Sequence, residues 1–227
     1  MNKSGYSFLI LLLFLSSGLF GQSENTEYID LNLWTEVTEN LPTVNNETPS
    51  YLSDNKIYHR ILEDALWIIS GMVYGYEVNF TPLDLTRKVN ENLEVTPLAS
   101  IDWGDEKLKI IDTWVKNGKF NIQVRYFPNE AQIIRMKLWA SNIYPDSSGT
   151  GIESIFSGYQ GRVESIKTGI KEALRNYFRI RYTNKPREID CKVLIKNPPH
   201  TTLDAGGYRS SVTITIKLIK LLPYSYY

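Results

Sequence analysis

The stretch HTTLDAGGYRSS at residues 200–211 gathers side chains that can take part in acid–base chemistry or ligand binding. His200 can donate or accept hydrogen bonds, and Asp204 accepts them. Tyr208 and Arg209 can donate them. These four residues are a predicted ligand- or partner-binding site. A turn stabilised by Asp204 and the Gly-Gly pair that follows it explains the same composition about as well.

A second candidate site lies on the basic side of a predicted helix, where Lys171, Arg175 and Arg179 recur at four-residue spacing. Residues at this spacing share one face of a helix. A solvated helix surface accounts for such a row, and docking onto an acidic protein or polymer surface is the functional alternative. We therefore include these three residues among the predicted partner-binding positions.

The usual catalytic arrangements are incomplete in this sequence. His59 and Glu63 can approach one metal ion from a helix, but a zinc site needs at least one further protein ligand, and the other histidine, His200, lies in a distant loop. No Gly-x-Ser-x-Gly elbow presents a serine nucleophile. The acids clustered at 102–106 are more typical of a solvated turn than of a glycosidase pair. We predict no catalytic residues, no metal site and no cofactor.

Two further features suggest chemistry only superficially. The glycines of PDSSGTGIES, residues 145–154, are reminiscent of a phosphate-binding loop, but the Gly-Lys-Ser/Thr ending is missing. A flexible connection is the simpler interpretation, and its length leaves an exposed partner-binding role open. The single cysteine, Cys191, cannot form an intramolecular disulfide, so an ordinary core must stabilise the chain.

The charge balance and the first residues bear on partners and location. The chain has 25 basic and 25 acidic residues, which argues against a nucleic-acid or anionic-membrane partner. A polar start with Lys3, an apolar run from Phe8 to Leu15 and then small residues are typical of a secretory signal over 1–21, with an earlier cleavage site open in the Ser-Ser-Gly stretch. We predict an exported protein, periplasmic or associated with the cell envelope, without a transmembrane span in the mature chain.

The mature chain divides into a polar arm over 22–53 and one domain over 54–227. The arm either lies extended with Trp34 on the domain or becomes ordered only when a partner binds. Within the domain, apolar spacing changes from three or four residues to two near Gly71. The segment LEDALWIISGMVYGYEVNF, residues 62–80, is therefore a helix that leads into a strand of the core. Its uncharged stretch is too short to cross a membrane.

The clearest local signal is Asn117-Gly118, the preferred pair for a two-residue hairpin turn, between runs at 107–116 and 119–127. Pairing Lys116 with Lys119 places Thr113 opposite Ile122 and continues in the same register to the hairpin's end. The other expected elements are helices over 54–70, 82–92, 129–142 and 160–180, strands over 74–81, 189–195 and 212–218, and a long loop over 144–161.

These elements predict an α+β domain with an antiparallel sheet of about five strands and the helices over 55–70 and 160–180 packed on one face. Trp67, Tyr74, Tyr76 and Phe80 are expected to be mostly buried.

Three segments carry a resemblance to known proteins. The leader ending LFGQ, the segment EDALWIISGMVYGY and the segment IKEALRNYFRIRYTNKPREI resemble a group of exported, uncharacterised proteins of spirochaete-type bacteria. The likeness covers most of the mature chain. It implies an exported location, and no activity or catalytic residue follows from it.

The leading functional hypothesis is a non-catalytic protein of the periplasm or cell envelope that binds a protein partner. A small-ligand carrier, with a cleft between the sheet and the long loop, is the alternative, and a hydrolase comes third. Export, the incomplete catalytic sets and the aromatic and basic surface candidates support the first hypothesis.

Overall fold

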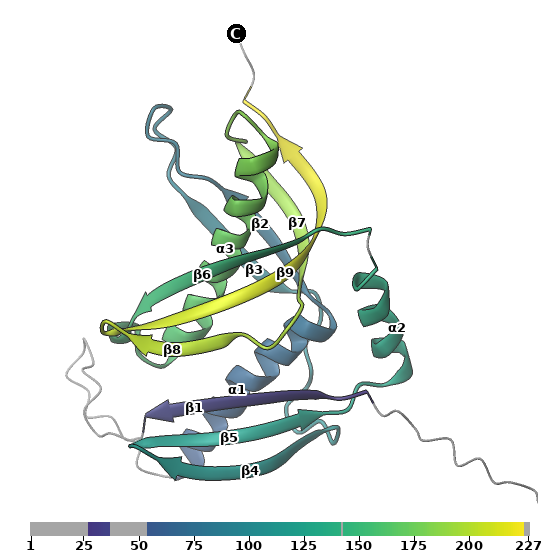
Figure 1. The fold of residues 1–227 in the computed structure, drawn as a ribbon, viewed down its shortest axis with the longest axis vertical. Helices are drawn as coiled ribbons and strands as arrows, with labels where there is room; N and C mark the ends of the chain where they lie inside the picture. Colours follow the sequence, from purple (N-terminus) through teal and green to yellow (C-terminus); the bar gives the residue numbers. More distant parts are fainter. Residues whose placement is uncertain (1–26, 37–53, 142, 225–227) are drawn as a thin grey trace, which may run out of the picture.

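The computed structural model describes residues 27–36, 54–141 and 143–224 (Figure 1). These residues form three α-helices, one 3-10 helix and nine strands in two antiparallel sheets. The α+β class predicted from the sequence is confirmed. The prediction of one sheet with about five strands is wrong, because several segments read as arm or loop are strands. The predicted leader over 1–21 lies outside the described residues.

The smaller sheet has the strand order β1-β5-β4. Its strands are β1 (Ile29–Glu36), β4 (Leu108–Lys116) and β5 (Lys119–Tyr126). β1 belongs to the region predicted as an extended arm, and it pairs with β5 along its whole length. Of that region, residues 22–26 and 37–53 lie outside the described residues.

The larger sheet has six strands in the order β3-β2-β7-β9-β6, with β8 paired to β9. They are β2 (Tyr76–Thr81), β3 (Asn92–Pro97), β6 (Asp146–Ser154), β7 (Glu188–Ile195), β8 (His200–Asp204) and β9 (Gly207–Leu222). The long β9 pairs with β8 through its first residues and with β7 through its last.

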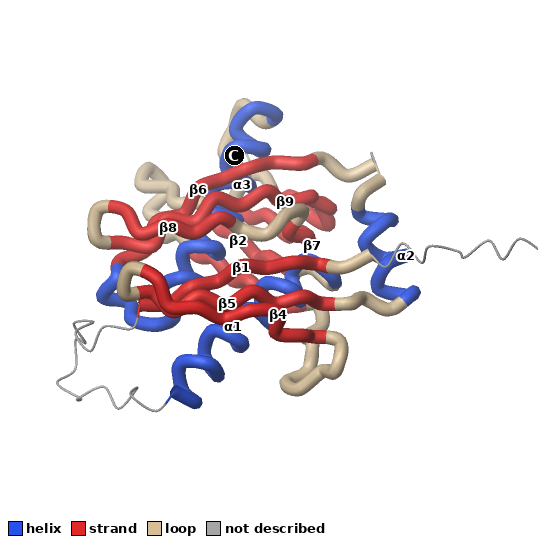
Figure 2. The backbone as a smooth tube through the Cα atoms, turned by 60° about the horizontal axis from the view of Figure 1, so that its bottom comes forward, coloured by secondary structure: helices blue, strands red, loops and turns tan. Residues whose placement is uncertain are grey.

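The helices pack on the two sheets, and α1 contacts both of them (Figure 1 and Figure 2). α1 (Asp54–Val73) packs on β1 and β5 of the small sheet and on β3 and β7 of the large one. α3 (Gly161–Arg181), which follows the 3-10 helix η1 (Ile155–Gln160), covers β6 and β9. α2 (Glu130–Trp139) lies at one end of the molecule. Buried side chains from both sheets, α1 and α3 form one continuous core.

The segment at 62–80 is helix followed by strand, as predicted, although the helix continues through Gly71 to Val73. A glycine stands at position 71 of the helix because the ring of Tyr76 packs against it, where any side chain would overlap the ring. Tyr76 donates a hydrogen bond to the Trp67 carbonyl oxygen at 2.7 Å and stacks on its ring. Tyr76 and Phe80 are buried as expected, whereas Trp67 and Tyr74 are half-buried.

The predicted hairpin is confirmed near its turn, where Asn117 and Gly118 both have positive φ and Lys116 pairs with Lys119. Beyond Asp112 the predicted register is wrong. A bulge between Ile110 and Asp112 shifts the pairing by one residue, so Ile110 rather than Ile111 lies opposite Val124.

The helix predicted over 82–92 is absent, and turns occupy this segment. Asp84 and Val89 form an isolated bridge, and the Asp84 carboxylate accepts hydrogen bonds from the backbone and side chain of Arg87. Lys88 adopts φ of 57°, which no α-helix allows. The local hydrogen bonds of Asp84 thus replace the helical ladder.

The prediction of a long loop over 144–161 is also wrong, since this segment contains β6 and η1. Gly149 and Gly151 share the face of β6 that packs on α3, and neither places a side chain between the two backbones. A Cβ atom at Gly151 would overlap the backbone of Ser165 and Gly169. The glycines that suggested a phosphate loop therefore allow a helix to pack directly on the backbone of a strand.

We predict that Gly151→Ala lowers the free energy of unfolding by about 3 kcal/mol, because two backbones must separate to admit one methyl group. Thr150→Ala, at the exposed residue beside it, is the matched control and should change stability by about 0.5 kcal/mol or less. Urea denaturation followed by circular dichroism measures both. Equal stability of the two variants would contradict the close packing.

Candidate functional site

The predicted site at 200–211 is a β-hairpin and not a loop. β8 and β9 pair from His200 with Ser211 to Asp204 with Gly207, and the turn residues Ala205 and Gly206 both have positive φ. Asp204 and Arg209 form an exposed salt bridge of 2.8 Å across it. A turn, the alternative interpretation of the sequence, thus accounts for this composition.

The structure separates Tyr208 from the other three predicted residues. His200, Asp204 and Arg209 are exposed on the hairpin, whereas Tyr208 is only 3% exposed. Its ring stacks on Trp34 of β1, with 6.2 Å between the ring centroids. Burial raises the pKa of Tyr208. Tyr208 therefore helps to hold the two sheets together.

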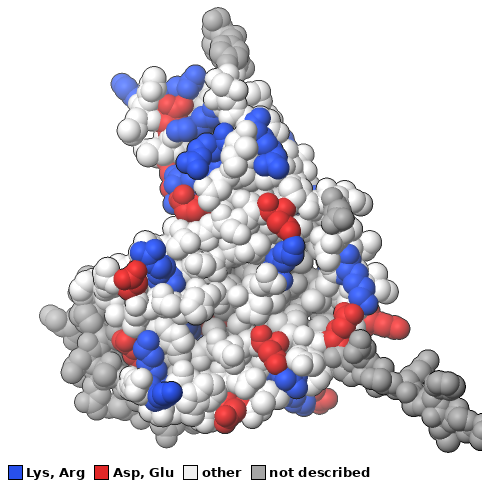
Figure 3. All heavy atoms as spheres, viewed as in Figure 1, with Lys and Arg blue, Asp and Glu red and all other residues white. Residues whose placement is uncertain are grey.

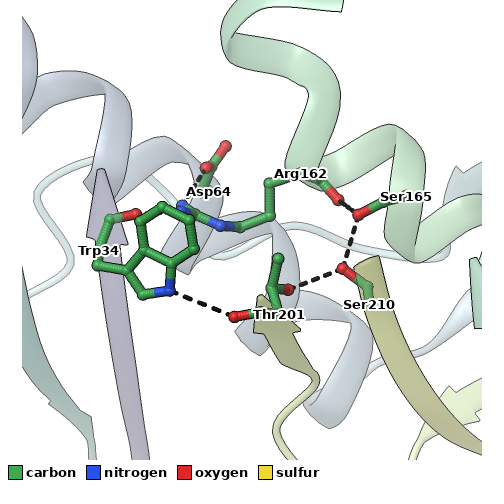
Figure 4. Close-up of polar contacts among 6 residues, drawn as sticks. All are labelled: Trp34, Asp64, Arg162, Ser165, Thr201 and Ser210. Carbon is green, nitrogen blue, oxygen red and sulfur yellow. Dashed lines mark hydrogen bonds and ion pairs between the residues drawn. The ribbon is translucent and has the colours of Figure 1, made fainter. Parts of the chain in front are cut away.

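Trp34, which stacks on Tyr208, also belongs to a polar network centred on Arg162 (Figure 4). Arg162 stands in the first turn of α3. It donates a hydrogen bond from Nη1 to Asp64 Oδ2 of α1 at 2.9 Å and another from Nη2 to the carbonyl oxygen of Trp34. The side chains of Arg162 and Asp64 are 5% and 11% exposed. One guanidinium thus binds α1, β1 and α3 together.

The network continues through hydroxyl groups to the large sheet (Figure 4). The Ser165 hydroxyl donates to the Arg162 carbonyl oxygen at 2.7 Å and lies 2.6 Å from Ser210 Oγ, which in turn lies 2.7 Å from Thr201 Oγ1. The indole Nε1 of Trp34 donates to the carbonyl oxygen of Thr201 at 3.3 Å. These contacts join the edge of the small sheet to β8 and β9. We call the six residues of Figure 4 the Arg162 network.

The electrostatics of the Arg162 network are those of a buried ion pair. Burial raises the pKa of Asp64, and the charges of Arg162 and Arg60 act against that rise. Arg162 Nε has no hydrogen-bond partner among the described residues. Because a buried charge without its counter-ion is costly, each member of the pair depends on the other.

The histidines are not part of the Arg162 network. Among the described residues neither histidine hydrogen-bonds to Ser165, Ser210 or Thr201. His59 stacks on the exposed Trp103, with 4.1 Å between the ring centroids. The hydrogen bonds of the Arg162 network can therefore position elements of both sheets.

Within 27–36, 54–141 and 143–224, no group of three or more His, Cys, Asp or Glu side chains could hold a metal ion. Cys191 is buried on β7, on the inner face expected from the sequence. Burial raises the pKa of its thiol to about 12, so it stays protonated at neutral pH. No helix of the described part is long and apolar enough to cross a bilayer.

The predicted basic site on α3 is largely neutralised. Lys171 and Arg175 both bind Glu91, and Arg175 also pairs with Glu172 at 2.5 Å. Arg179 is exposed and forms no ion pair with a described residue. The charge left for an acidic partner is therefore smaller than the sequence suggests.

Sequence reasoning missed the Arg162 network. Asp64 gave a signal, because a carboxylate inside an otherwise apolar helix face must find a partner. Arg162 gave another, since it lies next to the apolar stripe of α3 at 163–178. Nothing in the spacing joins residues 34, 64 and 162, which only the tertiary fold brings together.

Two of three comparisons with known proteins give a match. A protein-family model matches residues 17–224, and the chain belongs to that family. A protein of Treponema pallidum (strain Nichols), described as an uncharacterized protein, is 22% identical over 165 residues, which cover 73% of this chain and 69% of that protein. No solved structure matches. The predicted resemblance to uncharacterised spirochaete proteins is confirmed.

We predict that Arg162→Met lowers the free energy of unfolding by about 3 to 5 kcal/mol, because it leaves the Asp64 carboxylate buried without its counter-ion. The double variant Arg162→Met/Asp64→Leu should recover a large part of the loss, since it removes the stranded charge. Thermal or urea unfolding measures both. If the double variant is as unstable as the sum of the single variants, the two charges are not coupled.

Proposed function

We propose that the protein is an exported, non-catalytic protein of the periplasm or cell envelope that acts by binding a protein partner along β4. The signal-like pattern over 1–21 supports the location. The observation that carries the binding role is a group of exposed apolar side chains on an edge strand.

β4 forms one edge of the small sheet, with β5 on its inner side and no described strand on its outer side. Four of its apolar side chains are 39% to 66% exposed: Ile110, Ile111, Trp114 and Val115. The exposed Trp103 lies shortly before them in the chain. Exposed apolar side chains grouped along one edge strand are typical of a surface that another protein covers.

The hairpin geometry explains why these side chains stay uncovered. Phe120 and Ile122 of β5 face the core, but Val115, paired with Phe120, is 66% exposed. The small sheet therefore extends beyond the α1 surface that it packs on. Trp114 is a suitable anchor, because tryptophan contributes strongly to protein interfaces.

The edge also limits how a partner strand can pair with β4. The bulge at Ile110–Asp112 interrupts regular geometry, so residues 112–116 are the part of β4 that can accept a new strand. Lysines 109 and 116 flank the apolar group. A partner segment with apolar side chains and acidic flanks fits this arrangement.

The test is lysine-directed crosslinking in intact cells that express the chain, followed by mass spectrometry. We expect one dominant protein partner, with links on Lys109 and Lys116. The double variant Trp114→Ser/Val115→Ser should reduce the yield about tenfold, because it removes the apolar anchor.

Ile219→Ser is the matched control, since Ile219 is 55% exposed on β9, away from β4. It should leave the crosslinks unchanged. A wild-type protein found free and monomeric, or equal crosslinking by both variants, would overturn the proposal.

A further inference from the structure

A second surface, which shares no residue with β4, combines a cavity with positive charge. A cavity of about 440 Å³ lies between α2 and the outer face of the large sheet. Its walls come from α2, from the segment that joins α2 to β6, and from β7 and β9. Its size is within the range of small-molecule sites.

The charged residues that line this cavity are all cationic: Arg135, Lys192 and Lys217. No acid lines it. None of the three forms an ion pair with a described residue. Figure 3 shows Lys and Arg side chains over α2 and over the facing strands, with Asp and Glu side chains beside them.

The two lysines face each other across neighbouring strands. Lys192 of β7 is the register partner of Lys217 of β9. Lys192 lies between the buried Cys191 and Val193, and Lys217 follows the buried Ile216, so both side chains point to the outer face. Like charges directly opposite in a sheet destabilise it. Glu77 of β2 is the neighbour of Lys192 on the other side, but it does not line the cavity. An anion in the cavity would relieve the repulsion.

The rest of the lining is aromatic or apolar. Tyr74, Trp139 and Tyr144 contribute rings, and Leu98, Ile134 and Leu138 contribute aliphatic surface. Ile134 and Leu138 are 58% and 65% exposed on α2, because no described element covers them. Gln132 fixes the position of Tyr74 by donating to its hydroxyl at 2.7 Å. Flat rings beside cations suit a ligand with a ring and a negative charge.

We infer that this cavity binds a small anionic molecule in which a phosphate group is joined to a flat ring. Lys192 and Lys217 bind the phosphate through charge-assisted hydrogen bonds, and Arg135 contacts it from α2. The rings of Tyr74 and Tyr144 pack on the flat ring of the ligand. This binding role goes beyond the protein-binding function proposed for β4 and does not depend on it.

Another cavity, of about 580 Å³ between β2 and the end of α3, is less suited to an anion. Of its cations, Arg175 is already bound to Glu91 and Glu172, and Lys185 donates to the Leu83 carbonyl oxygen. Arg179 alone is left there, beside the negative end of the helix dipole.

The test is isothermal titration calorimetry of the purified protein with 1-naphthyl phosphate at low salt. We expect saturable binding that weakens about tenfold or more in Lys192→Met/Lys217→Met, because the phosphate loses both charged donors. Arg135→Met should weaken it as well. Lys220→Met removes a cation from the same strand outside the cavity and should leave the affinity within about twofold.

Two further ligands separate the contributions of charge and ring. The neutral 1-naphthol should bind about tenfold more weakly than 1-naphthyl phosphate, and so should inorganic phosphate, which has no ring. The lysine double variant should unfold at a temperature no lower than the wild type, since it removes a like-charge pair. No binding of 1-naphthyl phosphate, equal binding by the lysine variant, or equal binding of 1-naphthol would overturn the inference.

Discussion

The buried contact between Arg162 and Asp64 is the constraint on which the rest of the structure depends. The core contains side chains from both the small and the large sheet, and α1 packs its apolar side chains on both of them. Apolar contacts are not directional, so they allow the sheets to slide relative to each other. The ion pair and the hydrogen bond from Arg162 to the Trp34 backbone select one arrangement, because any other leaves a charge buried without its partner.

The local parts of this fold could be predicted from the sequence, and the reasons are physical. Asn117-Gly118 defines its turn because both residues tolerate positive φ, and the α3 stripe shows a clear helical period. The bulge at Ile110–Asp112 and the strand β6 could not be predicted in this way. A bulge does not change the alternation of apolar residues in a way that the sequence reveals. A glycine-rich segment such as β6 has the same composition whether it forms a loop or a strand that packs on a helix.

The candidate sites show the same limit. The spacing of Lys171 and Arg175 correctly placed both on one helix face, but Glu91, which neutralises them, is 80 or more residues away in the chain. Tyr208 was predicted as a binding residue from its neighbours, whereas its alternation in β9 turns it inward, onto Trp34. The Lys192 and Lys217 pair was not recognised, since opposite positions on two strands become visible only once their register is known.

Native-state hydrogen exchange, measured as a function of denaturant, tests most directly whether the two sheets form one cooperative unit. The account predicts that the slowest amides of β5 and those of β7 and β9 exchange through the same global unfolding, with equal free energies and equal denaturant dependence. Exchange of β1, β5 and β4 at a free energy several kcal/mol below that of the large sheet would contradict it. In that case the small sheet would open by itself, and the Arg162 network would not be what holds the molecule together.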